Sequence, residues 1–242
     1  MIAGGVVVVT GAASGIGAAC VRAARERGAS VVAVDRAAVE AADGVTPVRL
    51  DVCDAEAVAA LGEQVRAAYG RCDVLICSAG IAPVGNATDC TVDEWDAAFA
   101  VNARGTWLSC RALLELLAEG AGGAIVTIAS GAGLRPHGDL AAYSASKAAV
   151  IALTRSMALS YGPRGVRVNC VAPGVIDTPL NDAVVAERGG GAAGLEALVA
   201  GTALQRVGRP EDVAATVAFL AGPDAALITG STVVADGGRV LH

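Results

Sequence analysis

The sequence is poor in several residue types, and each shortage excludes a class of function. The chain has 242 residues and a formal net charge of −6, and Lys147 is the only lysine among its 18 basic residues. Nucleic acid is therefore excluded as the main partner, because phosphate binding needs a basic face. The longest apolar run near the start is "VVVV", far short of the roughly 20 residues that cross a bilayer. We expect no membrane span and, without a basic segment leading into an apolar stretch, no secretory signal.

Histidine is scarce, and the cysteines lack metal-type spacing. His137 and His242 are the only histidines, and the seven cysteines include no Cys-x-x-Cys pair. A structural zinc site needs such clusters, so we expect no metal. Unpaired thiols within apolar patterns are typical of a reducing compartment, which favours a cytoplasmic protein.

Short β-branched runs alternate along the chain with longer segments rich in alanine and leucine. The expected strands span 5–10, 30–35, 46–52, 72–80, 122–130, 165–174 and 231–236. The expected helices span 15–28, 54–69, 91–118, 141–160 and 210–221. Strands separated by helices predict a parallel sheet, and almost wholly apolar strands indicate that both of its faces are covered. We expect an α/β fold in three layers, a doubly wound parallel sheet of about seven strands flanked by helices, as one domain over 1–242.

One segment departs from this pattern. Within residues 178–209, glycines interrupt a helical pattern in the stretch ERGGGAAGLEALVAG. Glycine both weakens a helix and permits movement. The segment is therefore either a loose surface connection or a lid over a site.

Three glycines, Gly11, Gly15 and Gly17, lie between the first expected strand and the first expected helix. Glycine lets the backbone approach a pyrophosphate closely, and the N-terminus of the helix offers unpaired N–H groups and the positive end of its dipole. A glycine cluster alone is a weak signal. Its place after a strand and before a helix favours a dinucleotide-binding loop over a plain turn.

Two carboxylates at strand ends suit the other half of such a ligand. Asp35 ends the second expected strand, where it can accept both hydroxyls of an adenosine ribose and repel a 2′-phosphate, which favours NAD over NADP. Arg36 follows at once and can bind that phosphate, so NADP stays as the less favoured cofactor. Asp51, with Val52 beside it, is placed either to contact the adenine edge or to cap the next helix, a role that Asp54 also fits.

Tyr143 and Lys147 stand four residues apart and share one face of the expected helix. A free phenol has a pKa of about 10, too high for a base at neutral pH. An ammonium at roughly 4 Å, in an effective dielectric near 20, contributes about 4 kcal/mol, or about three pKa units, and brings the phenol near its working range. Lysine suits this task because its compact charge on a flexible stem reaches ribose hydroxyls beside the phenol, whereas arginine presents a broad planar fork.

Several segments together resemble a known family. The chain is similar to the short-chain dehydrogenase/reductase superfamily, in its single-domain branch, over essentially its whole length and most specifically in TGAASGIG (10–17), CSAG (77–80), YSASK (143–147) and PGVIDT (173–178). The resemblance implies a Rossmann-type fold. The fourth-strand motif of the family reads Asn-Asn-Ala-Gly, and Cys77 and Ser78 replace both asparagines here, whereas Ala79 and Gly80 keep the small surface that a cofactor ribose needs.

The resemblance also assigns catalytic roles to four residues. It implies that Ser130 holds the substrate oxygen and that Tyr143 exchanges a proton with it. It further implies that Asn102 bends its helix and anchors a water in a proton relay to Lys147. All four residue types are present at the matching positions.

The cofactor contacts follow from the same resemblance. The implied cofactor-binding residues are Gly11, Ser14, Gly15, Ile16, Gly17, Asp35, Arg36, Asp51, Val52, Ser78, Ala79, Gly80, Tyr143, Lys147, Pro173, Gly174, Ile176 and Thr178. Ile176 and Thr178 would contact the nicotinamide. The segment 178–209 leaves from that contact, which favours the lid.

The expected reaction is hydride transfer between a secondary alcohol or dihydrodiol and NAD, with Tyr143 as the general base or, in reverse, the acid. The candidate substrate contacts are Ser130, Leu134, His137 and Tyr143. Arg135 and His137 fit either a substrate-binding role or solvated loop positions. Two alternatives stay open: an NADPH-dependent 3-oxoacyl-carrier-protein reductase, against which Asp35 argues, and a non-catalytic NAD-binding regulator, against which the intact catalytic set argues. The resemblance implies a small-molecule substrate and a homotetramer, with a dimer as the fallback.

Overall fold

Seven parallel strands form one sheet in the order β3-β2-β1-β4-β5-β6-β7. A computed structural model describes residues 4–120, 122–187 and 189–241. The strands are β1 (Val6–Thr10), β2 (Ser30–Asp35), β3 (Val45–Arg49), β4 (Val74–Cys77), β5 (Ala124–Ile128), β6 (Arg167–Pro173) and β7 (Thr232–Ala235). The strand order reverses between β1 and β4, and such a switch point opens a crevice at the carboxyl ends of the strands. The predicted Rossmann-type sheet is confirmed.

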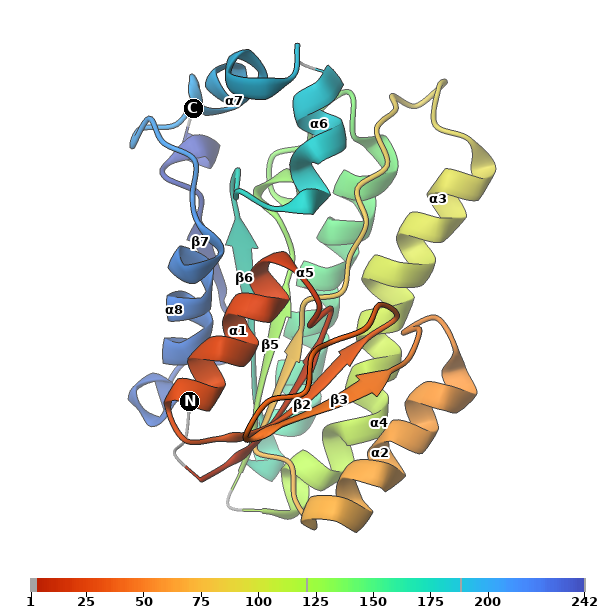
Figure 1. Cartoon of the computed structure of the whole chain (residues 1–242), viewed down its shortest axis with the longest axis vertical. Helices are drawn as coiled ribbons and strands as arrows, with labels where there is room; N and C mark the ends of the chain where they lie inside the picture. The colour runs from red at the N-terminus through yellow and green to blue at the C-terminus, as the bar shows by residue number, and fades with distance from the viewer. Residues whose placement is uncertain (1–3, 121, 188, 242) are drawn as a thin grey trace.

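Helices cover both faces of this sheet (Figure 1). One face carries α1 (Gly15–Glu26) and α8 (Pro210–Ala221), and the other carries α2 (Ala55–Tyr69), α4 (Thr106–Glu119) and α5 (Ala141–Tyr161). This is the doubly wound, three-layer arrangement that the sequence predicted. Within the described ranges, no helix has both the length and the apolarity needed to cross a bilayer.

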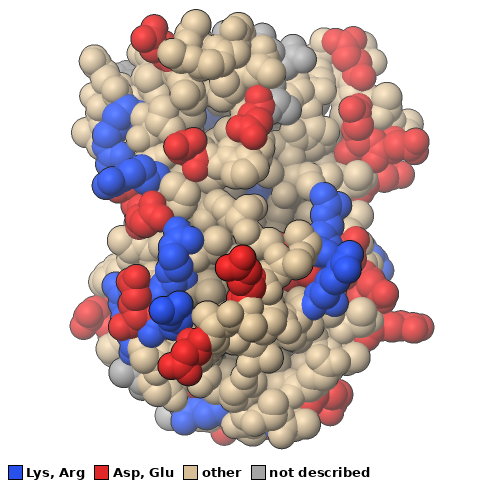
Figure 2. Space-filling model, in the orientation of Figure 1, with Lys and Arg blue, Asp and Glu red and all other residues tan. Residues whose placement is uncertain are grey.

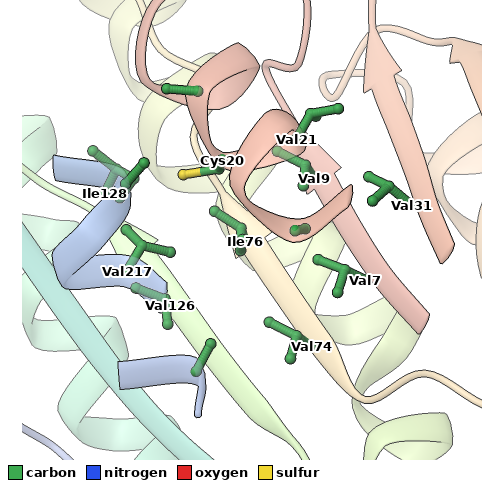
Figure 3. Close-up of a cluster of buried hydrophobic side chains, with 14 of the residues drawn as sticks. Val7, Val9, Cys20, Val21, Val31, Val74, Ile76, Val126, Ile128 and Val217 are labelled. Carbon is green, nitrogen blue, oxygen red and sulfur yellow. The ribbon is translucent and has the colours of Figure 1, made fainter. Parts of the chain in front are cut away.

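Successive side chains of β1 enter two different apolar clusters. Val7 and Val9 join the cluster beneath α1 and α8, and Val6 and Val8 join the one beneath α2 and α4. Figure 3 shows the first cluster, where strand valines lie close to Cys20 of α1. Because neighbouring side chains of a strand point to opposite faces, a strand covered on both faces must be apolar throughout. Burying each such valine contributes about 1.5–3 kcal/mol.

The expected helix over 91–118 is confirmed as a continuous helical stretch over 92–119, but it contains a π-helical turn that the sequence did not predict. Here α3 (Val92–Ala98) runs into a π-helical turn, Phe99–Gly105, before α4 begins. Asn102 lies in that turn and is completely buried, with 0% of its surface exposed. A π turn adds one residue per turn without changing the apolar pattern much, so hydrophobic periodicity does not reveal it; such turns are frequent at functional sites.

The glycine-interrupted segment forms a short 3₁₀ turn, Pro179–Asn181, and two helices, α6 (Asp182–Glu187) and α7 (Gly191–Val199). Both helices lie beyond the carboxyl ends of the strands, at the top of Figure 1. Gly190 just before α7 has φ of 70°, a left-handed conformation that glycine adopts at little cost. The glycines thus mark a boundary between two helices.

Candidate active site

A cavity of about 1050 Å³ lies at the carboxyl ends of the strands. It receives residues from the turns that follow β1, β2, β4, β5 and β6, and from α5. The sequence-predicted residues that line it are Gly11, Ser14, Gly15, Ile16, Asp35, Arg36, Asp51, Val52, Ser78, Ala79, Gly80, Ser130, His137, Tyr143, Lys147, Pro173, Gly174, Ile176 and Thr178. Most of the predicted site is therefore brought to one place.

Three predicted site residues lie outside the cavity lining. Gly17 stands behind the glycine loop, and Asn102 is buried behind the catalytic helix. Leu134, expected to contact substrate, is 41% exposed and lies outside the cavity. Leu134 lies in a short loop after β5. The direction of its side chain could not be predicted from the sequence, because neighbouring side chains in a loop can point either into the site or into solvent.

The cavity also has lining residues that sequence reasoning missed. Val184 and Leu198 come from α6 and α7, and Arg239 and Val240 come from the end of the chain. Motif spacing carried no signal for them. Their place depends on how distant segments pack over the strand ends.

The glycine loop leaves backbone exposed where a phosphate would approach. Gly11 has φ of 71°, and a Cβ atom there would lie 2.5 Å from the Ala79 nitrogen. A Cβ atom on Gly17 would lie 1.9 Å from the Gly11 carbonyl oxygen, so side chains are sterically excluded at both positions. Ser14 precedes α1 without a side-chain capping bond. The first N–H groups of a helix lack intrahelical partners, so this end of α1 suits a pyrophosphate.

The Asp35 carboxylate is fixed at the end of β2 by two backbone donors. Ala13 N–H donates to Oδ2 at 3.0 Å, and Ala37 N–H donates to Oδ1 at 2.9 Å. Each carboxylate oxygen can accept further hydrogen bonds, so the group stays able to bind ribose hydroxyls. Arg36 lines the same part of the cavity.

Asp51 does not cap the helix that follows it. Asp54 is the N-cap of α2, and it accepts hydrogen bonds from Glu56 N–H and Ala57 N–H at 3.0 Å each. The Asp51 carboxylate instead accepts from Cys53 N–H at 2.8 Å and lines the cavity. The structure therefore does not support the capping role for Asp51, and its contact with an adenine edge stays a prediction.

Tyr143 and Lys147 face one another inside the cavity from successive turns of α5. Their side chains are almost fully buried, and the Lys147 Nζ lies 5.7 Å from the centre of the Tyr143 ring. The ammonium donates a hydrogen bond to the Ile128 carbonyl oxygen at 2.9 Å. Ser130, which follows β5, lines the same cavity, and its side chain acts to lower the pKa of Tyr143.

Burial, more than charge, sets the acidity of these two groups. It raises the pKa of Tyr143, and the Ser130 side chain acts in the lowering direction. Burial also lowers the pKa of Lys147 to about 8, while the nearby Cys170 thiol acts to raise it. The sequence argument considered only the attraction between ammonium and phenolate, and it omitted the desolvation that opposes both charged forms.

Asn102 connects the π turn to the catalytic helix. Its Oδ1 accepts from Ile81 N–H, and its Nδ2 donates to the Ile81 carbonyl oxygen and to Ser146 Oγ, all at 2.9 Å. Ser146 Oγ in turn donates to the Tyr143 carbonyl oxygen at 2.8 Å. A Cβ atom on Gly80 would lie 3.2 Å from Asn102 Oδ1, so a small residue is required beside this amide.

These residues fit a nicotinamide dinucleotide. The bare backbone at Gly11 leaves room for a pyrophosphate, and Asp35 and Asp51 would stand on the side of the adenosine. Residues 173–176, Thr178 and Lys147 line the same cavity and would stand on the side of the nicotinamide. A bound nicotinamide would supply the hydride acceptor beside the Tyr143 hydroxyl.

Known proteins are similar to this chain in sequence and in fold. A family model described as Enoyl-(Acyl carrier protein) reductase matches residues 11–239. The chain is 38% identical to D-threitol dehydrogenase of Mycolicibacterium smegmatis, over 98% of this chain and 94% of that protein. It is 40% identical to cis-4-hydroxycyclohexanecarboxylate dehydrogenase of Sinomonas cyclohexanicum, over 96% and 95%. The structure of Thermoplasma acidophilum aldohexose dehydrogenase superimposes with a TM-score of 0.94 at 31% identity, covering 99% of this chain and 95% of that one.

The relatives are named as dehydrogenases, and each match spans nearly the full length of both chains. The alternative of a non-catalytic regulator is therefore set aside. The fold, the glycine loop and the Ser130, Tyr143 and Lys147 cluster agree with these matches. The chain belongs to the short-chain dehydrogenase/reductase superfamily, and it is an oxidoreductase that acts on alcohol groups with a nicotinamide cofactor.

Proposed function

We propose that this enzyme oxidises a secondary alcohol or dihydrodiol with NAD and that Tyr143 is its general base. The observation that carries the proposal is the Tyr143 side chain, buried in the cavity that Ser130 also lines and close to the Lys147 ammonium. The named relatives all act on compounds that carry hydroxyl groups. When such a substrate is oxidised, the proton leaves from the oxygen and the hydride from the carbon of the same carbinol group.

Each side chain has one task in this proposal. The Ser130 and Tyr143 hydroxyls hold the substrate oxygen, and Tyr143 takes its proton as the carbinol hydride departs. Lys147, with a pKa of about 8, is mostly protonated at neutral pH and offsets the negative charge that develops on the phenol. Asn102 contacts no reacting atom in this scheme; it positions α5 through Ser146.

Asp35 supports NAD as the cofactor. Its carboxylate is held at the cavity edge by two N–H donors, where it would accept ribose hydroxyls and repel a 2′-phosphate. One observation favours a second candidate, an NADPH-dependent 3-oxoacyl-carrier-protein reductase, because Arg36 lines the same region. A guanidinium there can bind the 2′-phosphate.

The segment 178–209 serves as a lid in this proposal, within a single domain that spans the chain. Val184 of α6 and Leu198 of α7 pack in one apolar cluster with Tyr143 and Leu140. Lid helices that contact the catalytic residue can exclude water from it when closed.

The proposed assembly is a homotetramer in the cytoplasm. Trp107 on α4 is 42% exposed and Leu159 on α5 is 82% exposed, which supports burial of these helix faces between subunits. All seven cysteines are free thiols, which supports a reducing compartment.

A panel of alcohols with each cofactor tests the proposal. Secondary alcohols, polyols and cyclic diols are each incubated with NAD or NADP, and the formation of reduced cofactor is followed by its absorbance. The expected result is oxidation of at least one secondary alcohol with a higher kcat/KM for NAD. Reduction of a 3-oxoacyl thioester with a preference for NADPH would support the second candidate instead. NAD binding without oxidation of any alcohol would contradict the proposal.

A further inference from the structure

The two ends of the cavity differ in charge. The carboxylates that line it, Asp35 and Asp51, stand at the adenosine end. Around Tyr143 the ionisable lining residues are basic instead, namely Lys147, Arg135, His137 and Arg239, and no aspartate or glutamate joins them within the part of the chain that the structure describes.

This basic end stands out against the rest of the molecule. The chain has a net charge of −6, and Figure 2 shows acidic side chains gathered over α3, where Asp93 and Glu94 open the helix. A random sample of its surface would contain more acidic than basic groups. A cavity wall of one sign inside a protein of the opposite sign concentrates a ligand of complementary charge.

Arg135 is held in place without being neutralised. Its Nη1 donates to the Arg239 carbonyl oxygen at 3.2 Å, and the Arg239 guanidinium donates to the Leu198 carbonyl oxygen. These contacts tie the loop after β5 to the end of the chain and to α7. Arg135 has five N–H donors, and its one recorded contact uses a neutral acceptor, so its charge stays available within the described residues.

Apolar side chains line the cavity beside the catalytic residues. Tyr143 is 7% exposed, whereas Arg135 lies in an exposed loop at the cavity rim. Ala132, Leu140 and Leu198 line the cavity as part of the apolar cluster that holds Tyr143. A ligand that fills this end therefore meets the buried Tyr143 hydroxyl, apolar side chains and the exposed guanidinium of Arg135.

We propose that the physiological substrate is a hydroxy acid whose carboxylate is separated from the reacting secondary alcohol by an apolar spacer, and that Arg135 binds this carboxylate. The inference rests on the proposed oxidation of an alcohol beside Tyr143. Arginine suits the task because its planar fork pairs with both oxygens of a carboxylate. The carboxylate stays at the rim, where it remains partly hydrated, and the alcohol alone enters the buried end.

Two substrates of nearly the same shape, one charged and one neutral, test whether the cavity recognises the carboxylate. The substrate pair is 4-(1-hydroxyethyl)benzoate and the neutral 4-(1-hydroxyethyl)benzamide, each oxidised with NAD. We expect the wild type to have a higher kcat/KM for the benzoate by about tenfold, the value of one charged hydrogen bond at a partly exposed site. Arg135→Gln should lower this benzoate-to-benzamide ratio about tenfold, and Arg135→Lys, which keeps the charge but loses the fork, should lower it less. Arg25→Gln removes an exposed arginine of α1 that lies outside the cavity and should keep the wild-type ratio.

A binding measurement separates this inference from the proposed function. Calorimetry with NAD-saturated protein compares 4-acetylbenzoate with 4-acetylbenzamide, the ketone products, which need no turnover. Tighter binding of the benzoate that is lost in Arg135→Gln supports the anion site, even if neither alcohol is oxidised, a result that would count against the proposed function alone. Equal affinity for both ketones in the wild type, or an unchanged preference in Arg135→Gln, overturns the inference.

Discussion

The Asn102 side chain donates a hydrogen bond to Ser146 Oγ at 2.9 Å, one residue before Lys147. This bond joins the π turn between α3 and α4 to the catalytic helix. The same amide is bonded to both backbone groups of Ile81, so one buried side chain fixes three segments relative to each other. The position of α5, and with it of Lys147, thus depends in part on Asn102 and Ser146, which lie outside the cavity lining.

Replacing Asn102 should destabilise the protein. Asn102→Ala leaves Ile81 N–H, its carbonyl and one Ser146 lone pair without partners in a buried site, which costs about 2–4 kcal/mol of unfolding free energy. Urea unfolding measures this loss. Ser160→Ala is the control, because Ser160 is exposed and bonds only to the Ser156 carbonyl oxygen; it should change stability by less than about 0.5 kcal/mol. If both substitutions changed the unfolding free energy by the same small amount, the role of Asn102 in joining the three segments would be contradicted.

Cofactor preference should follow Asp35. Asp35→Ser removes the charge that repels a 2′-phosphate, so kcat/KM for NADP should rise relative to NAD by about tenfold or more. Steady-state kinetics with both cofactors measures the ratio. Asp43→Ser removes an exposed carboxylate that lies outside the cavity and should leave the ratio unchanged. A wild type that already prefers NADP would show that Arg36 dominates.

Stability should depend on pH through Lys147. Burial lowers its pKa from 10.5 to about 8, so between these values the unfolded chain binds more protons at this residue than the folded chain does. The unfolding free energy therefore rises with pH across this window, by up to about 3 kcal/mol from this group. Below pH 8 the lysine is charged in both states and its desolvation cost is present in full.

Comparison with Lys147→Met isolates this effect. Buried cysteines such as Cys20, whose pKa burial raises to about 12, lower stability as pH rises above 9. The cysteines that do not interact with Lys147 titrate alike in both proteins and cancel in the difference, whereas Cys170, which does interact with it, is replaced by alanine in both. Urea unfolding of cofactor-free protein from pH 7 to 10 should show the protein that keeps Lys147 gaining stability relative to Lys147→Met. Parallel curves would mean that the buried ammonium keeps an ordinary pKa.

Much of the fold was predictable because both faces of the sheet are covered. Local patterns can be read directly from a sequence. The predictable features are of this kind: the apolar strands, the glycine loop after β1 and the four-residue spacing of Tyr143 and Lys147. The sequence offered both Asp51 and Asp54 as the N-cap of α2. It could not decide between them, because both lie close to the start of the helix.

The remaining features depend on tertiary packing. The π turn around Asn102 is stabilised by bonds to Ile81, 21 residues away, which no local pattern displays. Arg239 reaches the cavity because the end of the chain folds back over α7. Leu134 was misplaced for the same reason, since loop side chains are oriented by contacts that form only in the folded protein. The pKa of Tyr143 was misjudged because burial is itself a tertiary property.

The central claim is that the Tyr143 phenol carries the proton, and Tyr143→Phe tests it most directly. The substitution removes one oxygen and keeps the ring that packs in one cluster with Leu140, Val184 and Leu198. NAD affinity is measured by calorimetry, and kcat is measured with the best alcohol of the panel. The account predicts that kcat falls by about 10²–10⁴-fold while NAD affinity stays within a few-fold. A kcat close to that of the wild type would contradict it.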